Sequence, residues 1–197
     1  MSNLRKVFFG IDPGKEGFIT AYIPELNEYR FYSMPEHKVP TGKLLKSGKE
    51  EMKTEFHAEG FRKLVVDLHS EYKGYKIIAA IEEVGGRQGW SAENNFNFGH
   101  TAGLQLMILI MLNADIEKVR PQKWQSFMYQ GHKKVMVPSS TGKTMVNDTK
   151  ATSALVATSI EPTINFKKTD RSSKIHDGKT DSFLICLYRF RRYVEQV

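Results

Sequence analysis

Two short apolar runs mark the centre of the predicted fold. One covers residues 7–9 and continues to Ile11, and the other covers residues 77–81. Runs of this length without alternating polar positions are typical of strands buried on both faces. Each run ends in a carboxylate, Asp12 in the first and Glu82 in the second. The pattern therefore predicts two central strands that carry acids at their carboxyl ends.

Three further segments have the composition of strands. Phe18–Ile23 follows a Pro-Gly turn and predicts a hairpin with the first strand, and residues 29–34 alternate like a third strand. Residues 114–119 predict another short strand late in the chain. Strands joined by short turns, followed by strands that alternate with helices, indicate an α/β fold around a mixed sheet.

Helical periodicity and capping residues predict helices between and after these strands. Pro121 stands at a favoured first-turn position, and Asp148 is placed to cap the helix that follows it. Residues 106–112 are apolar all round, which predicts that this part of its helix is buried. The predicted helices cover residues 55–72, 92–112, 121–129, 148–159 and 177–194.

Two segments lack any period and contain several lysines. Residues 37–53 and 130–147 are interpreted as mobile basic loops that follow a nucleic acid, and plain solvated loops remain the alternative. No internal repeat, linker or change of composition divides the chain, so residues 1–197 are interpreted as a single domain.

Charge and composition narrow the class of partner. The chain of 197 residues has 29 Lys and Arg against 22 Asp and Glu, a net charge of +7. This excess indicates a polyanion, and without a basic amphipathic helix nucleic acid is favoured over a membrane surface. The single Cys186 excludes an internal disulfide and a cysteine-based zinc site, and it favours a reducing compartment. No apolar stretch is long enough to span a bilayer, so a cytoplasmic protein is expected.

Carboxylates stand at three places where a core element meets a loop: Asp12, Glu82, and the pair Asp177 and Asp181. If the two central strands are parallel neighbours, Asp12 and Glu82 emerge at one edge of the sheet, where open α/β folds bind ligands. Glu83 points to the opposite face from Glu82, so only one of the two can join the cluster. Asp177 and Asp181 stack on one helical face, where like charges repel unless a cation lies between them.

These acids predict a metal-dependent reaction. Carboxylates without cysteine, and with only scattered histidines, favour Mg²⁺ or Mn²⁺ over zinc. Two such ions about 3.5–4 Å apart stabilise the attacking and leaving oxygens of an in-line phosphoryl displacement. Together with the basic charge, this predicts hydrolysis of a phosphodiester. For each acid an ordinary role stays open: Asp12 as a turn residue, Glu82 as a strand-end charge, Asp177 as a helix N-cap.

Four motifs occur in order along most of the chain: residues 10–14 (GIDPG), 80–84 (AIEEV), 99–103 (GHTAG) and 176–182 (HDGKTDS). With these motifs the chain resembles the RNase H-like superfamily, and within it the RuvC-type Holliday-junction resolvases, especially their phage-encoded relatives. The resemblance implies a five-stranded mixed sheet of order 3-2-1-4-5 flanked by helices. It also implies a homodimer that resolves four-way DNA junctions by paired nicks, with two Mg²⁺ ions per active site, in the cytoplasm of a bacterium or a phage-infected host.

The resemblance assigns catalytic and metal-binding roles to four acids. Asp12 and Glu82 match the first two acids of the family, and Asp181 matches the last. Cellular relatives place an Asp or His three residues before the last acid, where this chain has Gly178. The fourth role is therefore assigned to Asp177, one residue earlier.

Further roles are implied for residues around these acids. Two side chains are auxiliary candidates at the metal site, His176 and Glu83. Lys123 and Lys150 resemble basic residues that approach the scissile phosphate, with plain surface lysines as an equal alternative. Relatives carry an aromatic wedge shortly after the second acid, where this chain has Gly85. Trp90 is the candidate to stack on a base in its place, and simple packing is the alternative.

Other functions were weighed against junction resolution. Residues 140–144 (STGKT) resemble the end of a phosphate-binding loop, but Val137 stands where that loop needs glycine and no strand leads into it. A nucleotide cofactor is therefore not expected. Two alternatives remain: a nuclease of the same fold acting on branched or fork DNA or on RNA–DNA hybrids, and a non-catalytic junction-binding protein.

Overall fold

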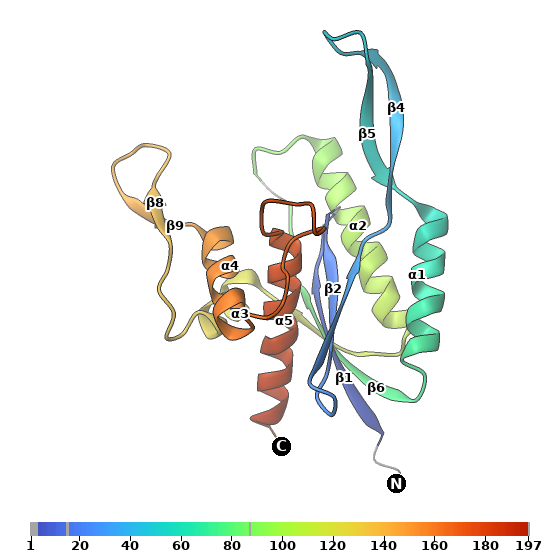
Figure 1. Cartoon of the computed structure of the whole chain (residues 1–197), viewed down its shortest axis with the longest axis vertical. Helices are drawn as coiled ribbons and strands as arrows, with labels where there is room; N and C mark the ends of the chain where they lie inside the picture. The colour runs from blue at the N-terminus through green and yellow to red at the C-terminus, as the bar shows by residue number, and fades with distance from the viewer. Residues whose placement is uncertain (1–3, 15, 87, 197) are drawn as a thin grey trace.

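A five-stranded mixed sheet forms the centre of the molecule (Figure 1). The computed structural model describes residues 4–14, 16–86 and 88–196. The strands lie in the order β3 (Glu28–Ser33), β2 (Phe18–Ile23), β1 (Arg5–Asp12), β6 (Tyr75–Glu82) and β7 (Asp115–Val119). The first three form an antiparallel meander, and β6 and β7 run parallel to β1. When only the strands of this sheet are numbered, the order is the predicted 3-2-1-4-5. The last two strands are labelled β6 and β7 because β4 and β5, which were not predicted, precede them in the chain.

Helices cover both faces of this sheet (Figure 1). On one face α1 (Ala58–Glu71) and α2 (Ala92–Met111) pack against the strands, and on the other lie α3 (Pro121–Met128), α4 (Thr149–Ile160) and α5 (Asp177–Val194). Asp148 caps α4 as predicted, accepting a hydrogen bond from the amide of Ala151 at 3.0 Å. The bounds of α5 are the predicted ones. None of the described helices has the length and apolar character needed to cross a membrane.

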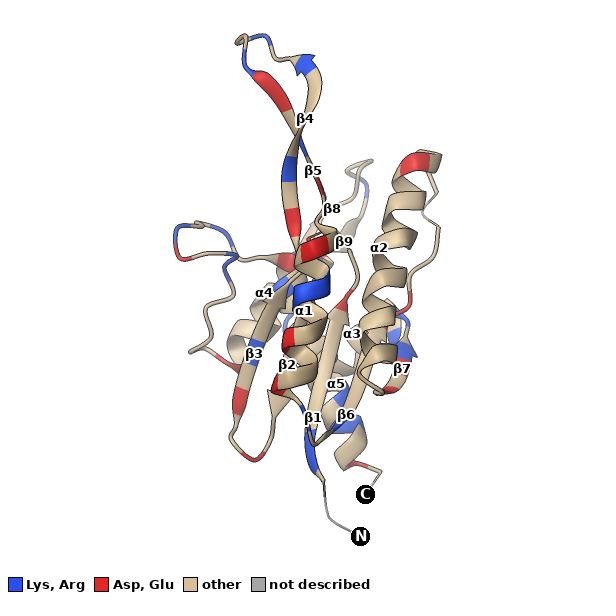
Figure 2. Cartoon of the chain, turned by 90° about the vertical axis from the view of Figure 1, so that its right-hand side faces the viewer, with Lys and Arg blue, Asp and Glu red and all other residues tan. Residues whose placement is uncertain are grey.

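Both segments interpreted as loops contain hairpins, so the prediction that they lack strands was wrong, while their contact with a nucleic acid stays a prediction. Residues 37–53 lie in the ribbon of β4 (Glu36–Leu44) and β5 (Glu50–Phe56), which extends beyond the body (Figures 1 and 2). Residues 130–147 contain the short pair β8 (Met136–Pro138) and β9 (Met145–Asn147). Both ribbons are largely exposed, and a ribbon with water on both faces needs no alternation of polar and apolar residues.

The prediction that residues 106–112 are buried was also wrong in part. Ile108 and Leu109 are fully buried, whereas Met107, Ile110 and Met111 are 47%, 54% and 57% exposed. Only one side of α2 meets the sheet, so an apolar residue on its other side remains in contact with solvent. The stretch is apolar all round although the helix packs on one side only.

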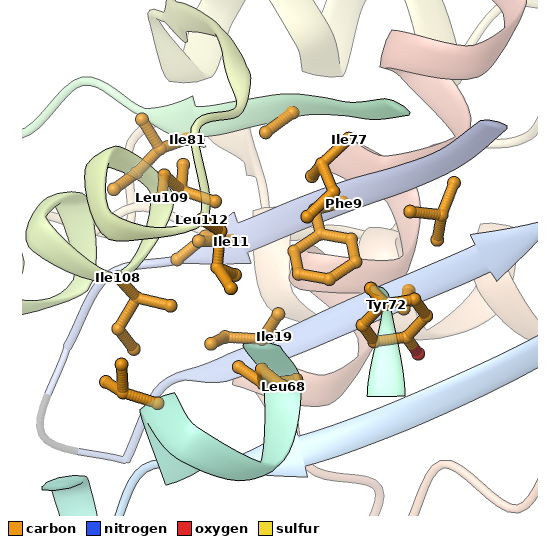
Figure 3. Packing of buried hydrophobic residues seen from close by; sticks show 14 of the residues in the cluster. Phe9, Ile11, Ile19, Leu68, Tyr72, Ile77, Ile81, Ile108, Leu109 and Leu112 are labelled. Atoms are coloured by element: carbon orange, nitrogen blue, oxygen red, sulfur yellow. The ribbon is translucent and has the colours of Figure 1, made fainter. Parts of the chain in front are cut away.

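The core on the α1 and α2 face is built by alternate residues of the central strands (Figure 3). Phe9 and Ile11 of β1 are fully buried there, packed with Leu68 of α1 and Leu109 of α2. Each such side chain contributes about 1.5–3 kcal/mol when it is fully buried. The intervening residues of β1, Phe8 and Gly10, face the opposite side, which α5 covers.

Helix α5 packs directly on the backbone of β1. A Cβ atom at Gly10 would lie 2.1 Å from the amide nitrogen of Cys186 and 2.2 Å from the carbonyl oxygen of Ser182. No other residue type leaves room for this approach. The hydroxyl groups of Thr20 and Ser182 also hydrogen-bond at 2.8 Å between β2 and α5. The helix is thereby placed over the carboxyl end of β1.

Candidate active site

Two of the predicted acids lie at the ends of neighbouring parallel strands. β1 and β6 pair in parallel with Ile11 opposite Ile81, so Asp12 and Glu82 follow at the next positions. Because side chains alternate along a strand, Asp12 shares the face of Gly10, which meets α5. The condition under which the two acids emerge at one edge of the sheet, parallel pairing of their strands, is therefore met.

Asp181 of α5 joins the same electrostatic environment. The pKa of its carboxyl group is raised to about 7, mainly by burial and also by the nearby carboxylates of Glu82 and Asp177, while a hydrogen bond with Ser153 and the charge of Lys150 oppose the rise. Within the described part of the chain, its Oδ1 atom is buried and makes no hydrogen bond. A carboxylate whose pKa is raised in this way by burial and neighbouring negative charge is suited to hold a proton or a cation.

Glu82 is oriented by a tryptophan that the sequence analysis did not single out. The indole Nε1–H of Trp124 donates a hydrogen bond to Oε2 of Glu82 at 2.8 Å. Trp124 lies in α3 and is fully buried. Its ring packs in the core while its one polar atom finds a partner, which is the usual arrangement for a buried tryptophan. Nothing local in the sequence links the two residues, which lie 42 positions apart.

The carboxylate of Asp177 forms an ion pair with a lysine. Nζ of Lys150 lies 2.6 Å from Oδ2 of Asp177. This contact raises the pKa of Lys150, and the charges of Asp181 and Asp12 raise it as well. Lys150 therefore serves as a counter-charge to the acids in this structure. Its predicted contact with DNA stays a prediction.

Gly178 lies against Asp12, which gives a physical reason for the missing acid at this position. A Cβ atom there would lie 2.9 Å from Oδ2 of Asp12 and 2.8 Å from the carbonyl oxygen of Glu16. Any side chain at 178 would have to displace one of them. His176 packs on the ring of Phe18, with centroids 5.0 Å apart, and burial lowers the pKa of this histidine. Its predicted auxiliary role stays a prediction.

The structure places three other predicted residues in contacts of their own. Glu83 forms an ion pair with Arg120 at 3.3 Å, and Lys123 pairs with Glu117 at 3.0 Å. Trp90 is 42% exposed, and its ring packs edge-on against Phe98.

Trp90 also lines a groove of about 730 Å³ between the base of the β4–β5 ribbon and α2. Among the described residues, none of the four predicted acids lines this groove. The predicted stacking of Trp90 on a base stays a prediction. At Gly85 a Cβ atom would meet nothing within 4 Å, so packing does not require a glycine there.

The donor set fits a hard divalent cation by its chemistry. All the acids offer carboxylate oxygens, and the buried Oδ1 of Asp181 makes no hydrogen bond within the described chain. No group of three or more His, Cys, Asp or Glu residues among those described is arranged to hold a metal ion. Glu82 is bound by Trp124 and Asp177 by Lys150, so two of the four carboxylates are turned toward protein donors. The acids are gathered, but their oxygens are not arranged as a metal-ligand shell.

Comparisons with known proteins give a weak structural likeness. No family model and no curated protein matches the chain. Two similar solved structures are Thermus thermophilus RuvC in complex with a Holliday junction substrate, at 12% identity and a TM-score of 0.49, and Thermus thermophilus RuvC, at 17% identity and a TM-score of 0.42. Each alignment covers 95% of this chain and 96% of the other. With identities and TM-scores this low, function has to be argued from this chain's own side chains, and a phage-type origin stays a prediction.

Proposed function

We propose that this protein is a divalent-metal-dependent nuclease that cleaves branched DNA, with four-way junctions as its principal substrate. The observation that carries the proposal is the environment of Asp181. Its carboxyl group is buried beside the carboxylates of Glu82 and Asp177, and its pKa is raised to about 7. Such a concentration of negative charge at the carboxyl ends of two parallel strands is unfavourable, and Lys150 offsets it only in part, so a bound cation would stabilise the site.

The chain's own residues would divide the work as follows. Asp12, Glu82 and Asp181 would hold the ions, Mg²⁺ or Mn²⁺, with Asp177 released from Lys150 to join them. Two bound ions supply charge stabilisation for the attacking and leaving oxygens of an in-line phosphoryl displacement. Trp124 would keep Glu82 in one orientation through its hydrogen bond of 2.8 Å. Freed from Asp177, the Lys150 ammonium would be available to a phosphate oxygen.

The choice of substrate rests on charge and on the resemblance noted above. A net charge of +7 favours DNA or RNA, and the motifs around the acids resemble those of junction resolvases. A homodimer would place two such sites on one junction and would allow paired nicks in the cytoplasm of the host. A nuclease for fork DNA or RNA–DNA hybrids, and a binding protein without catalysis, are the alternatives that the experiment separates.

The test compares cleavage of a labelled four-way junction by the wild-type protein and the variant Asp12→Asn, with and without Mg²⁺. The expected result is symmetric nicks that need Mg²⁺ and are lost in the variant, while junction binding remains. Asp67→Asn is a matched control, because Asp67 is an exposed acid on α1 that pairs with Lys63 at 2.6 Å. The control should cleave like the wild type.

Three outcomes would contradict parts of the proposal. Full activity in Asp12→Asn would remove this acid from catalysis and end the assignment. Faster cleavage of forks, flaps or hybrids than of junctions would shift the substrate class. Salt-sensitive junction binding without any Mg²⁺-dependent product would indicate the non-catalytic alternative.

A further inference from the structure

The β4–β5 ribbon extends from the body of the molecule without a third strand. Its two strands pair from Glu36 opposite Phe56 to Leu44 opposite Glu50, and within the described chain they form a sheet of their own (Figure 1). At about 3.3 Å per residue, the nine residues of β4 span roughly 30 Å. An isolated two-stranded ribbon is at best marginally stable, so core packing does not explain its length.

The tip of this ribbon carries lysines, which Figure 2 shows in blue, and exposed leucines. Residues 41–49 contain three lysines and no acid: Lys43, Lys46 and Lys49. Between them Leu44 is 75% exposed and Leu45 is 49% exposed. The ribbon's ion pairs within the described chain lie toward its base instead, Lys53 with Glu55 at 2.7 Å and Glu36 with Lys168 at 2.8 Å. Glu50 and Glu51 follow Lys49 directly, so residues 41–51 carry three lysines against two glutamates, a small excess of positive charge around two exposed leucines.

The base of the ribbon is fastened to the turn that follows Asp12. Nζ of Lys168 lies 2.8 Å from Glu36 at the start of β4 and 3.9 Å from Glu16. The carbonyl oxygen of Glu16 in turn lies against Gly178, next to Oδ2 of Asp12. The base of the ribbon and the acid cluster are therefore neighbours, joined through Lys168, Glu16 and Gly178.

We propose that the β4–β5 ribbon is a DNA-binding arm that holds one duplex arm of the branched substrate. The tip lysines contact backbone phosphates, and Leu44 and Leu45 enter a groove, as exposed leucines of DNA-bending proteins do. This inference rests on the proposed function, because it takes DNA as the substrate at the acids. A reach of roughly 30 Å corresponds to about eight or nine base pairs at 3.4 Å each.

An anionic membrane is the other polyanionic surface that such a tip could meet. Binding at a membrane interface scales with the buried apolar area, and stable binding needs more than two leucines. The ion pairs of Lys168 with Glu36 and Glu16 link the ribbon to the turn beside the acids. This link has no role at a membrane, whereas it is useful if the ribbon and the acids act on one DNA molecule. These two observations favour DNA.

The test replaces the three tip lysines together, as Lys43→Gln, Lys46→Gln and Lys49→Gln. The matched control, Lys6→Gln, Lys73→Gln and Lys76→Gln, removes the same charge near the amino-terminal ends of β1 and β6, the opposite end of the sheet. Affinity for a fluorescent four-way junction is measured without divalent metal over a range of salt concentrations. Each lost phosphate contact should reduce the slope of log K against log salt by about 0.9, so the tip variant should lose about two to three.

The leucines and the position on DNA have separate readouts. Leu44→Ser with Leu45→Ser should weaken binding without changing the salt slope, because no charge is lost. Hydroxyl-radical footprinting of the wild type should show protection about eight base pairs from the cleaved phosphate, and the tip variant should lose it. Equal effects of the tip and control variants on DNA binding would overturn the proposal, and so would an unchanged salt slope in the tip variant. A tip variant that binds DNA normally but no longer binds phosphatidylserine vesicles would also overturn it.

Failure of the arm and failure of the nuclease give different results. The salt slope is measured without divalent metal, so it reports DNA binding by the arm independently of cleavage. If the wild type cleaves and the tip variant keeps the full salt slope, the arm proposal is wrong. If the wild type never cleaves but the tip variant loses the slope, the nuclease proposal is wrong and the arm stands.

Discussion

The variant Asp181→Asn should make the metal-free protein more stable at neutral and alkaline pH. Burial and the neighbouring carboxylates raise the pKa of Asp181 from 3.8 to about 7 in the folded protein. Between these values the folded protein keeps a proton that the unfolded chain has lost, so stability falls as pH rises. Above pH 7 or so the folded state carries the full unfavourable charge. An asparagine carries none.

The magnitude follows from the two pKa values. The gap between 3.8 and about 7 corresponds to about 4 kcal/mol, at about 1.4 kcal/mol per pKa unit. For a chain of this size, a change of 1 kcal/mol shifts the melting temperature by about 2–4 °C. The variant should therefore melt roughly 8–16 °C above the wild type near pH 8, and close to the wild type near pH 4.

The assay is thermal unfolding followed by circular dichroism, in EDTA, at a series of pH values. Asp67→Asn is again the control, since Asp67 is an exposed acid on α1, away from the acid cluster. Adding Mg²⁺ should raise the melting temperature of the wild type more than that of Asp181→Asn, because the ion stabilises only a state that binds it. A stability difference that stays constant from pH 4 to about 8 would refute the assignment of raised pKa to Asp181.

Two more variants test the residues that shape the site. Trp124→Phe keeps a ring in the core but removes the hydrogen-bond donor to Glu82, and a hydrogen bond to a charged group is worth about 1.5–3 kcal/mol. Both the melting temperature and the cleavage rate should therefore fall. Unchanged values would show that this hydrogen bond does not position Glu82. Gly178→Ala should lower the melting temperature by overpacking against Asp12, about 1–3 kcal/mol, and should weaken the response to Mg²⁺. Gly103→Ala in α2 meets no atom within 4 Å and should be neutral or stabilising; equal losses in both glycine variants would contradict the explanation.

The central strands and most helices could be predicted because their signals are local. The apolar runs of β1 and β6, and the Asp148 cap of α4, are visible in a few consecutive residues. The β4–β5 ribbon could not be predicted in this way, because neither of its faces is buried over most of its length. Burial of α2 was predicted too broadly, since the sequence does not tell which side of an apolar helix the sheet will cover.

The acids of the candidate site were predictable for the same local reason, and their partners were not. Asp12 and Glu82 each end an apolar run, so their position at the sheet edge follows from strand pairing alone. The bonds from Trp124 to Glu82 and from Lys150 to Asp177 join residues 42 and 27 positions apart. They depend on how α3 and α4 pack, which no short segment of sequence encodes.

The glycine at position 178, at the start of α5, is explained by the way that helix reaches the acids. To bring Asp181 into the field of Glu82, the helix must lie on the backbone of β1, and Gly10 permits this contact. The same approach presses the first turn of α5 onto Asp12, where only the glycine at 178 fits. A fourth carboxylate therefore has no room at 178, and Asp177 is the nearest acid outside the contact. Its side chain is 45% exposed, and Lys150 neutralises its charge.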